Sequence, residues 1–248
     1  MPDELRSFQP RRNPEVTGRP ITSDAAIANE VREAGHELLR HMSDYFVQQR
    51  TVLNEIILVP LIIFSRIVRT HDAINALIRD EFYTEAAVLL LTQFELRLDI
   101  AYTASEIEHA TRWLSHEERK WQVMSIPAKI KALFPGVSDE YYKRLKEIVE
   151  CLHGIKHGNP IYSELGFPVR HEGRQVIIST GEITDGFSKA FGNLMSLCSS
   201  YQLGWSSQVL NVCTAKYTKI DPTIRHRVRE LERALHPVEE SRRSFVCF

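Results

Sequence analysis

Two short stretches of this chain carry the residues best suited to chemistry. The first closes a predicted helix with His153, Lys156, His157 and Asn159. Imidazole, ammonium and amide groups at one helix end can bind an anion or move a proton. The second is the leucine-rich run LLLTQFELRLD, which contains a carboxylate, Glu95. We therefore take His157, Lys156, Asn159 and Glu95 as the candidate catalytic residues.

Glu95 is predicted to lie on a mainly apolar helix face. Its neighbours one turn away are Leu91, Leu98 and Tyr102, and side chains three or four positions apart share a helix face. A buried carboxylate must find a partner or stay protonated. Two interpretations stay open: a structural ion pair or edge position, and a general base, metal ligand or substrate anchor.

His153 and His157 are one helical turn apart, which is the spacing that two imidazole ligands need to reach one metal ion. With Glu150 they are the candidate metal ligands. Two imidazole nitrogens alone do not make a metal site, and we predict that the protein holds no cofactor. The alternative is structural, because a cation in the last turn interacts favourably with the helix dipole and Gly158 is typical of a helix end.

Glutamate and histidine recur at the spacing ExxH, which di-metal carboxylate proteins use on two helices of a bundle. A di-metal enzyme is therefore a further alternative. The pairs are Glu33 with His36, Glu106 with His109, and Glu150 with His153.

The common catalytic and phosphate-binding motifs are absent from the sequence. It contains no Walker loop, no GxGxxG following a strand, no GxSxG nucleophile elbow and no HExxH. A basic stretch at residues 225–233 is nearly neutralised by neighbouring acidic residues, which favours a solvated helix surface.

Composition indicates a globular protein. The chain has 248 residues, 43% hydrophobic content and a formal net charge of -1, enough for one domain with a proper core. Its densest apolar run, residues 56–64, is too short to span a bilayer, and the first twenty residues have no apolar signal core. Four widely spaced cysteines suggest neither disulfides nor a zinc knuckle. We predict a cytoplasmic protein that does not enter membranes.

Apolar periodicity predicts a mainly α fold, an irregular bundle of about seven or eight helices. Pro60 should kink or break the second helix, and Ser105 with Glu108 has the spacing of a capping box. Residues 1–22 and 237–248 are predicted tails around a single domain, 23–236, with a hairpin-like insertion near 164–180. The predicted helices span about 22–49, 52–79, 85–104, 105–122, 126–134, 138–158, 184–217 and 221–235.

Part of the chain, roughly residues 60 to 215, resembles a bacterial family of helical proteins defined only as a domain of unknown function. The resemblance rests on THDAI at residues 70–74, on Glu85-Ala86, on Glu95 with Asp99 and Tyr102, and on the HGNP end at residues 157–160. Leu91 stands where the family has an arginine one turn before the glutamate.

This family looks related to the HEPN class, helical domains associated with nucleotides and RNA. Many of them dimerise, and some are ribonucleases in toxin or phage-defence systems. Their cleavage motif places an arginine five to seven positions before the histidine, and this chain has Glu150, Cys151 and Leu152 there.

The resemblance and the two stretches lead to one functional hypothesis: a HEPN-like homodimer, not associated with membranes, that acts on or senses RNA or a nucleotide in stress or phage defence. In a cleavage mechanism His157 would be the general acid or base, Lys156 would stabilise charge on the phosphorane, and Asn159 would orient the phosphate. The alternative is a non-enzymatic helical interaction or dimerisation module.

Overall fold

The prediction of a mainly α protein is confirmed. The computed structural model describes residues 24–49, 55–115, 125–133, 139–157, 169–172, 175–178 and 185–215, with positions 222, 223, 226, 227 and 230. Its helices are α2 (Asp24–Gln49), α3 (Glu55–Arg79), α4 (Tyr83–Ser105), α5 (Ile107–Leu114), α6 (Ile126–Leu133), α7 (Asp139–Lys156) and α8 (Asp185–Thr214). Among the described residues, no helix is both long and apolar enough to cross a membrane.

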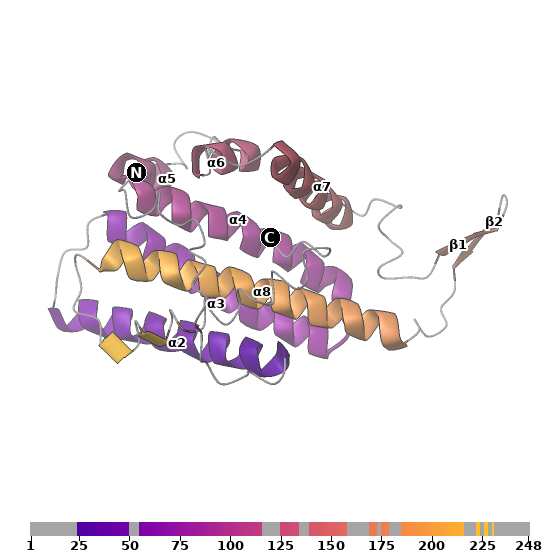
Figure 1. Ribbon diagram of the computed structural model, residues 1–248, viewed down its shortest axis with the longest axis horizontal. Helices are drawn as coiled ribbons and strands as arrows, with labels where there is room; N and C mark the ends of the chain where they lie inside the picture. Colours follow the sequence, from indigo (N-terminus) through magenta and orange to yellow (C-terminus); the bar gives the residue numbers. More distant parts are fainter. Residues whose placement is uncertain are drawn as a thin grey trace.

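The helices form successive layers (Figure 1). The long helix α2 lies on one side of α3 and α8, α4 packs against both of those helices, and α6 and α7 cover α4 on the side away from α2. Short connections allow α3 and α4 to run antiparallel. The strands β1 (Val169–Glu172) and β2 (Gln175–Ile178) pair antiparallel, with Val169 opposite Ile178.

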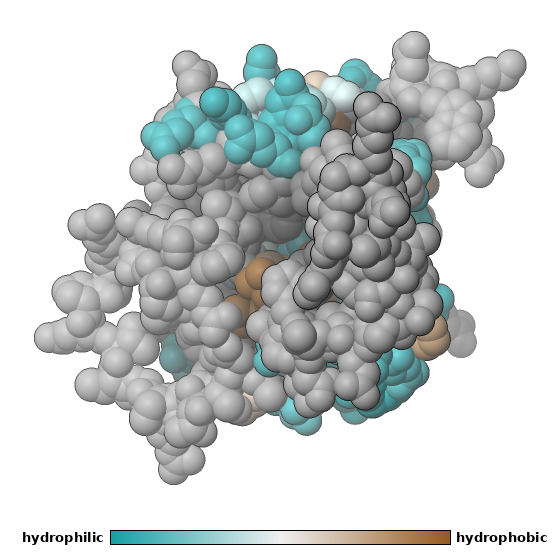
Figure 2. All heavy atoms as spheres, turned by 90° about the vertical axis from the view of Figure 1, so that its right-hand side faces the viewer, coloured by the Kyte–Doolittle hydropathy of each residue, from teal (hydrophilic) through white to brown (hydrophobic). Residues whose placement is uncertain are grey.

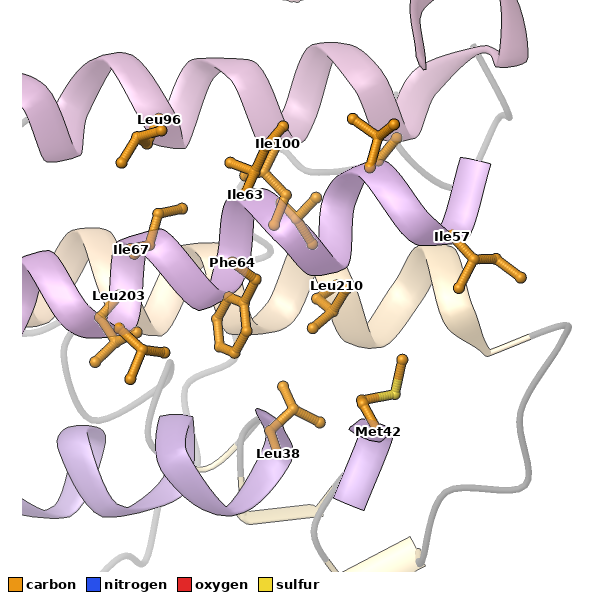
Figure 3. Packing of buried hydrophobic residues seen from close by; sticks show 14 of the residues in the cluster. Leu38, Met42, Ile57, Ile63, Phe64, Ile67, Leu96, Ile100, Leu203 and Leu210 are labelled. Atoms are coloured by element: carbon orange, nitrogen blue, oxygen red, sulfur yellow. The ribbon is translucent and has the colours of Figure 1, made fainter. Parts of the chain in front are cut away.

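The larger core fills the space between α2, α3, α4 and α8. Figure 3 shows Phe64 of α3 directed toward Leu38 of α2, with Leu210 of α8 beside it. All three side chains are fully buried, and each such burial stabilises the fold by about 1.5–3 kcal/mol. A second core joins α4 to α6, α7 and the N-terminal half of α8; there Ile155 anchors the last turn of α7.

Pro60 lies inside α3, which continues through it. Of the kink or break that Pro60 predicted, the break is absent. Proline removes one helical hydrogen bond, but Pro60 itself is buried and its neighbours Val59, Ile63 and Phe64 have no exposed surface. Tertiary packing of this helix outweighs the local cost.

The capping box predicted at Ser105 is wrong. Ser105 is the last residue of α4, and α5 begins after Glu106 without a side-chain cap. The Ser105 hydroxyl instead donates to the carbonyl of Tyr102 at 2.7 Å and lies 2.9 Å from Nδ1 of His109. A serine hydroxyl can bond to a preceding carbonyl of its own helix, so the same residue suits a helix end as well as a start.

Candidate functional site

The C-terminal end of α7 carries the histidine cluster predicted from the sequence. The rings of His153 and His157 lie parallel, with centroids 6.0 Å apart and planes 6° from each other. His157 and Lys156 are exposed, and His153 is half-buried. Because Ile155 is buried to 6% exposure on the opposite side of the turn, the core holds this end in place. Asn159 lies outside the described residues.

The surroundings of this pair belong to a mixed polar surface. Figure 2 views the end of the molecule at which α7 terminates, and hydrophilic side chains gather along its upper edge, where Figure 1 places α7. Glu150, one of the candidate metal ligands, lies 3.5 Å from the Lys146 ammonium group. Within the part of the chain that the structure describes, no three His, Cys, Asp or Glu side chains are grouped to hold a metal ion.

The other two ExxH pairs also have partners that do not form a shared metal site. The carboxylate of Glu33 accepts from Arg227, whereas His36 lies 2.9 Å from Asp72. Glu106 and His109 form only a 3.8 Å contact with each other. The three pairs therefore do not converge on a di-metal centre among the described residues, and the di-metal alternative loses its support.

Glu95 is half-buried, which agrees with the edge position that the sequence left open and not with a carboxylate enclosed by apolar side chains. The reason is that α4 has one stripe of intermediate exposure, formed by Val88, Thr92, Glu95 and Asp99 at helical spacing. Asp99 on this stripe forms an ion pair with the buried Lys129 of α6. In the described structure Glu95 bonds to neither histidine of α7 and has no ion-pair partner.

The interior holds a polar cluster that the sequence interpretation missed. His71 of α3, Gln93 of α4 and Ser199 of α8 have no exposed surface. Nδ1 of His71 lies 2.8 Å from the Ser199 hydroxyl, which donates to Oε1 of Gln93 at 2.7 Å. Asn75 lies 3.1 Å from Nε2 of His71 and accepts from Ser196 at 2.6 Å. One hydrogen-bonded chain thus joins three helices.

The donor and the acceptor of the hydrogen bonds between Gln93, Ser199, His71 and Asn75 follow from a backbone carbonyl at one end of the cluster. The carbonyl of Ser199 can only accept, so the nitrogen of the Gln93 amide faces it, at 3.2 Å, and Oε1 faces the Ser199 hydroxyl. Since that hydroxyl gives its single proton to Gln93, it must accept from Nδ1 of His71. Nε2 of His71 then accepts from Asn75, whose amide also donates to the His71 carbonyl at 3.0 Å.

His71 is held neutral in this arrangement. Burial lowers its pKa from 6.5 to about 4, against the opposing effect of the nearby Asp72 carboxylate. The neutral imidazole donates to Ser199, whereas a histidine that activates a serine nucleophile must accept the hydroxyl proton. With no exposed surface and the wrong hydrogen-bond polarity, His71 and Ser199 are structural.

Asp72, the next residue, faces outward and joins α3 to α2. Its carboxylate accepts from Arg32 at 2.6 Å and lies 2.9 Å from His36. Partial burial acts to raise the pKa of Asp72, but the hydrogen bond from Arg32 and the electrostatic attraction to His36 outweigh burial, so the pKa is lowered. This ion pair borders an open cleft over α2.

The cleft over α2 holds charges of both signs. Arg227 spans it, donating to Glu37 at 2.7 Å and to Glu33 at 3.2 Å. These contacts agree with the prediction of a surface with charges of both signs near residues 225–233, because Arg227 is paired with two carboxylates. We assign the cleft no ligand.

The sequence offered one signal for the buried cluster. His71 and Gln93 interrupt apolar runs at positions where the helical period demands a buried residue, flanked by Ile67, Ile74 and Leu90. Such residues must be hydrogen-bonded in a folded protein, but only the tertiary structure shows that Ser199, more than a hundred residues later, is the shared partner.

Comparison with known proteins adds no relative. The chain matches no family model, no curated protein and no solved structure.

Proposed function

We propose that this protein is a helical module that binds RNA or a nucleotide at the C-terminal end of α7, in a stress or phage-defence setting. The observation that carries the proposal is the parallel pair of imidazoles, His153 and His157, beside the exposed Lys156. Of the candidates predicted from the sequence, these are the ones that the fold places together at the surface. The family resemblance includes one of these residues, His157, in the HGNP end at residues 157–160.

The backbone at this position does not attract phosphate. The C-terminal end of a helix carries a partial negative charge, so affinity for an anion has to come from the side chains of His153, Lys156 and His157. Phosphate contacts of this kind bind without regard to base sequence and weaken as salt rises. We include self-association as a homodimer and a cytoplasmic location in the same proposal.

Titration of a fluorescent single-stranded RNA by anisotropy tests the binding. Replacing Lys156 with alanine is expected to weaken binding of all sequences alike and to reduce the slope of log affinity against log salt by about 1. Lys143→Ala, an exposed cation nearly four turns earlier on the same helix, is the matched control and should change affinity less. Equal affinity of wild type and the combined His153→Ala, Lys156→Ala and His157→Ala variant would refute the proposal.

Catalysis is a separate question with its own assay. If the site cleaves RNA, His157→Ala should abolish digestion while leaving the fold intact. A His157→Ala variant as active as wild type would remove His157 from the mechanism.

A non-enzymatic interaction module is the second candidate. It is favoured by the absence of convergence among Glu95, His153 and His157 in the described structure. This candidate predicts that His153→Ala and His157→Ala leave a cellular phenotype unchanged.

A further inference from the structure

The last turn of α7 presents three donor groups that the fold leaves unused. Lys156 and His157 follow His153 by three and four positions, so both share a helix face with it. Among the described residues, none of these three side chains has a hydrogen-bond or ion-pair partner. Ile155 packs into the second core on the opposite side of the turn and holds the three donors in place.

The spacing of the two imidazoles suits a single phosphate group. A hydrogen bond from nitrogen to oxygen spans about 2.7–3.2 Å. The rings of His153 and His157 lie parallel with centroids 6.0 Å apart, so an N–H group of each ring can reach oxygens of one phosphate placed between them. Lys156 adds a third donor on a flexible stem.

The preceding turns of α7 oppose an RNA backbone that follows the helix. Glu150 lies one turn before His153 on the same face, and its carboxylate is paired with the Lys146 ammonium group at 3.5 Å. Glu147 and Lys143, also exposed, bring one further charge of each sign. These four positions have no net charge, and backbone phosphates would meet two carboxylates there. The attraction for an anion is therefore confined to the last turn.

A terminal phosphate matches such a local site better than a phosphate within the backbone. A phosphate held by one ester bond carries about −1.5 to −2 charges at pH 7 and has three acceptor oxygens. Within an RNA strand each phosphate has two ester bonds, one negative charge and two free oxygens. Three donors in one turn can use all three oxygens of the terminal group, and charge-assisted hydrogen bonds strengthen with its charge.

We infer that the end of α7 recognises the terminal phosphate of an RNA end or of a nucleotide. His153, Lys156 and His157 are its donors, and Glu150 disfavours a backbone that continues along the helix. The inference rests on the proposed function and narrows its ligand to a phosphate monoester.

Anisotropy titrations of one internally labelled RNA test the inference. The RNA is prepared with a phosphate on its first nucleotide, with a phosphate on its last nucleotide, or with hydroxyl groups at both ends. At least one phosphorylated form is expected to bind about tenfold or more tightly than the hydroxyl form. The combined His153→Ala, Lys156→Ala and His157→Ala variant should lose this preference.

Competition distinguishes the two sources of a terminal phosphate. Adenosine monophosphate that displaces the phosphorylated RNA, where adenosine does not, assigns the site to nucleotides as well as to RNA ends. Displacement by phosphorylated RNA alone restricts the site to RNA ends. Either result supports recognition of the monoester.

Two further variants sharpen the test. Glu150→Gln should raise the affinity for the hydroxyl form and narrow the difference, because it removes a carboxylate from the path of the backbone. Lys143→Ala is the matched control and should leave the preference unchanged, and circular dichroism checks that every variant is folded.

The outcomes separate this inference from the proposed function. Equal affinity for all three RNA forms, lost together in the combined variant, overturns the inference and leaves RNA binding at α7 in place. A wild-type protein that binds none of the three RNA forms and no adenosine monophosphate overturns the proposed function, and the inference with it.

Discussion

His71 and His157 show how burial decides what a histidine does. His71 has no exposed surface, and both of its ring nitrogens are occupied by partners on its own and another helix. His157 is exposed at the end of α7 and stacks beside His153. The first histidine is committed to stability, and the second is available to a ligand. Residue type and helical spacing alone do not distinguish them.

The largest expected difference between the two regions is in stability. His71→Ala should lower the free energy of unfolding by about 3–5 kcal/mol, because it leaves a cavity and deprives both Ser199 and Asn75 of a partner. His157→Ala should change it by less than about 0.5 kcal/mol. Urea denaturation followed by circular dichroism measures both. Similar losses for the two variants would contradict the comparison.

The second prediction concerns pH. The pKa of His71 is about 4 in the folded protein, against 6.5 in the unfolded chain. Between these values the unfolded chain binds more protons, so stability is complete above about pH 6.5 and falls as pH decreases toward 4. The loss attributable to His71 is about 3 kcal/mol.

Urea titrations at several pH values, on wild type and His71→Gln, isolate this contribution. The glutamine variant lacks the titrating group, so its stability should fall less steeply between pH 6.5 and 4. Other histidines and carboxylates contribute to both proteins equally. Parallel curves for the two proteins would show that His71 is not held neutral.

The smallest expected loss of stability concerns a close contact of the α8 backbone beside the buried cluster. Gly192 of α8 lies one turn before Ser196, and a Cβ there would come within 2.8 Å of the Tyr83 ring and 3.0 Å of Ile78. Gly192→Ala should therefore destabilise the protein by about 1–3 kcal/mol through overpacking.

Gly35→Ala is the matched control. Its Cβ would meet the Leu203 side chain at 3.2 Å or more, where a small rotation relieves the contact, and alanine favours the helix. Thermal unfolding of both variants checks the pair. A Gly192→Ala protein as stable as the Gly35→Ala protein would show that α8 can move away from Tyr83 at little cost.

Much of the helical layout was predictable because it rests on local periodicity. The predicted segment 85–104 corresponds to α4, and 184–217 contains α8. Ser105 was misassigned because a serine between two helices has hydrogen-bonding options on both sides, and sequence spacing does not rank them. The sequence left a kink and a break open at Pro60, because the burial that offsets the local cost of proline is contributed by other helices.

The candidate site was predictable only in part. Helical spacing correctly placed His153 and His157 together, since that contact lies within one helix. Glu95 was expected on a mainly apolar helix face, either enclosed or at its edge, and only the packing of the helices decided that its stripe is half-exposed. The partners of His71 could not be predicted, because they come from two other helices.

The sequence by itself determined the helical class, most helix positions and the pairing of residues one turn apart, because these depend on interactions between near neighbours in the chain. Only the tertiary structure decided which polar residues became sealed in the core and which stayed in contact with solvent. The physical reason is that desolvation and hydrogen-bond satisfaction depend on every helix that packs around a side chain. His71 meets Ser199 across 128 positions of sequence, and no local pattern encodes that meeting.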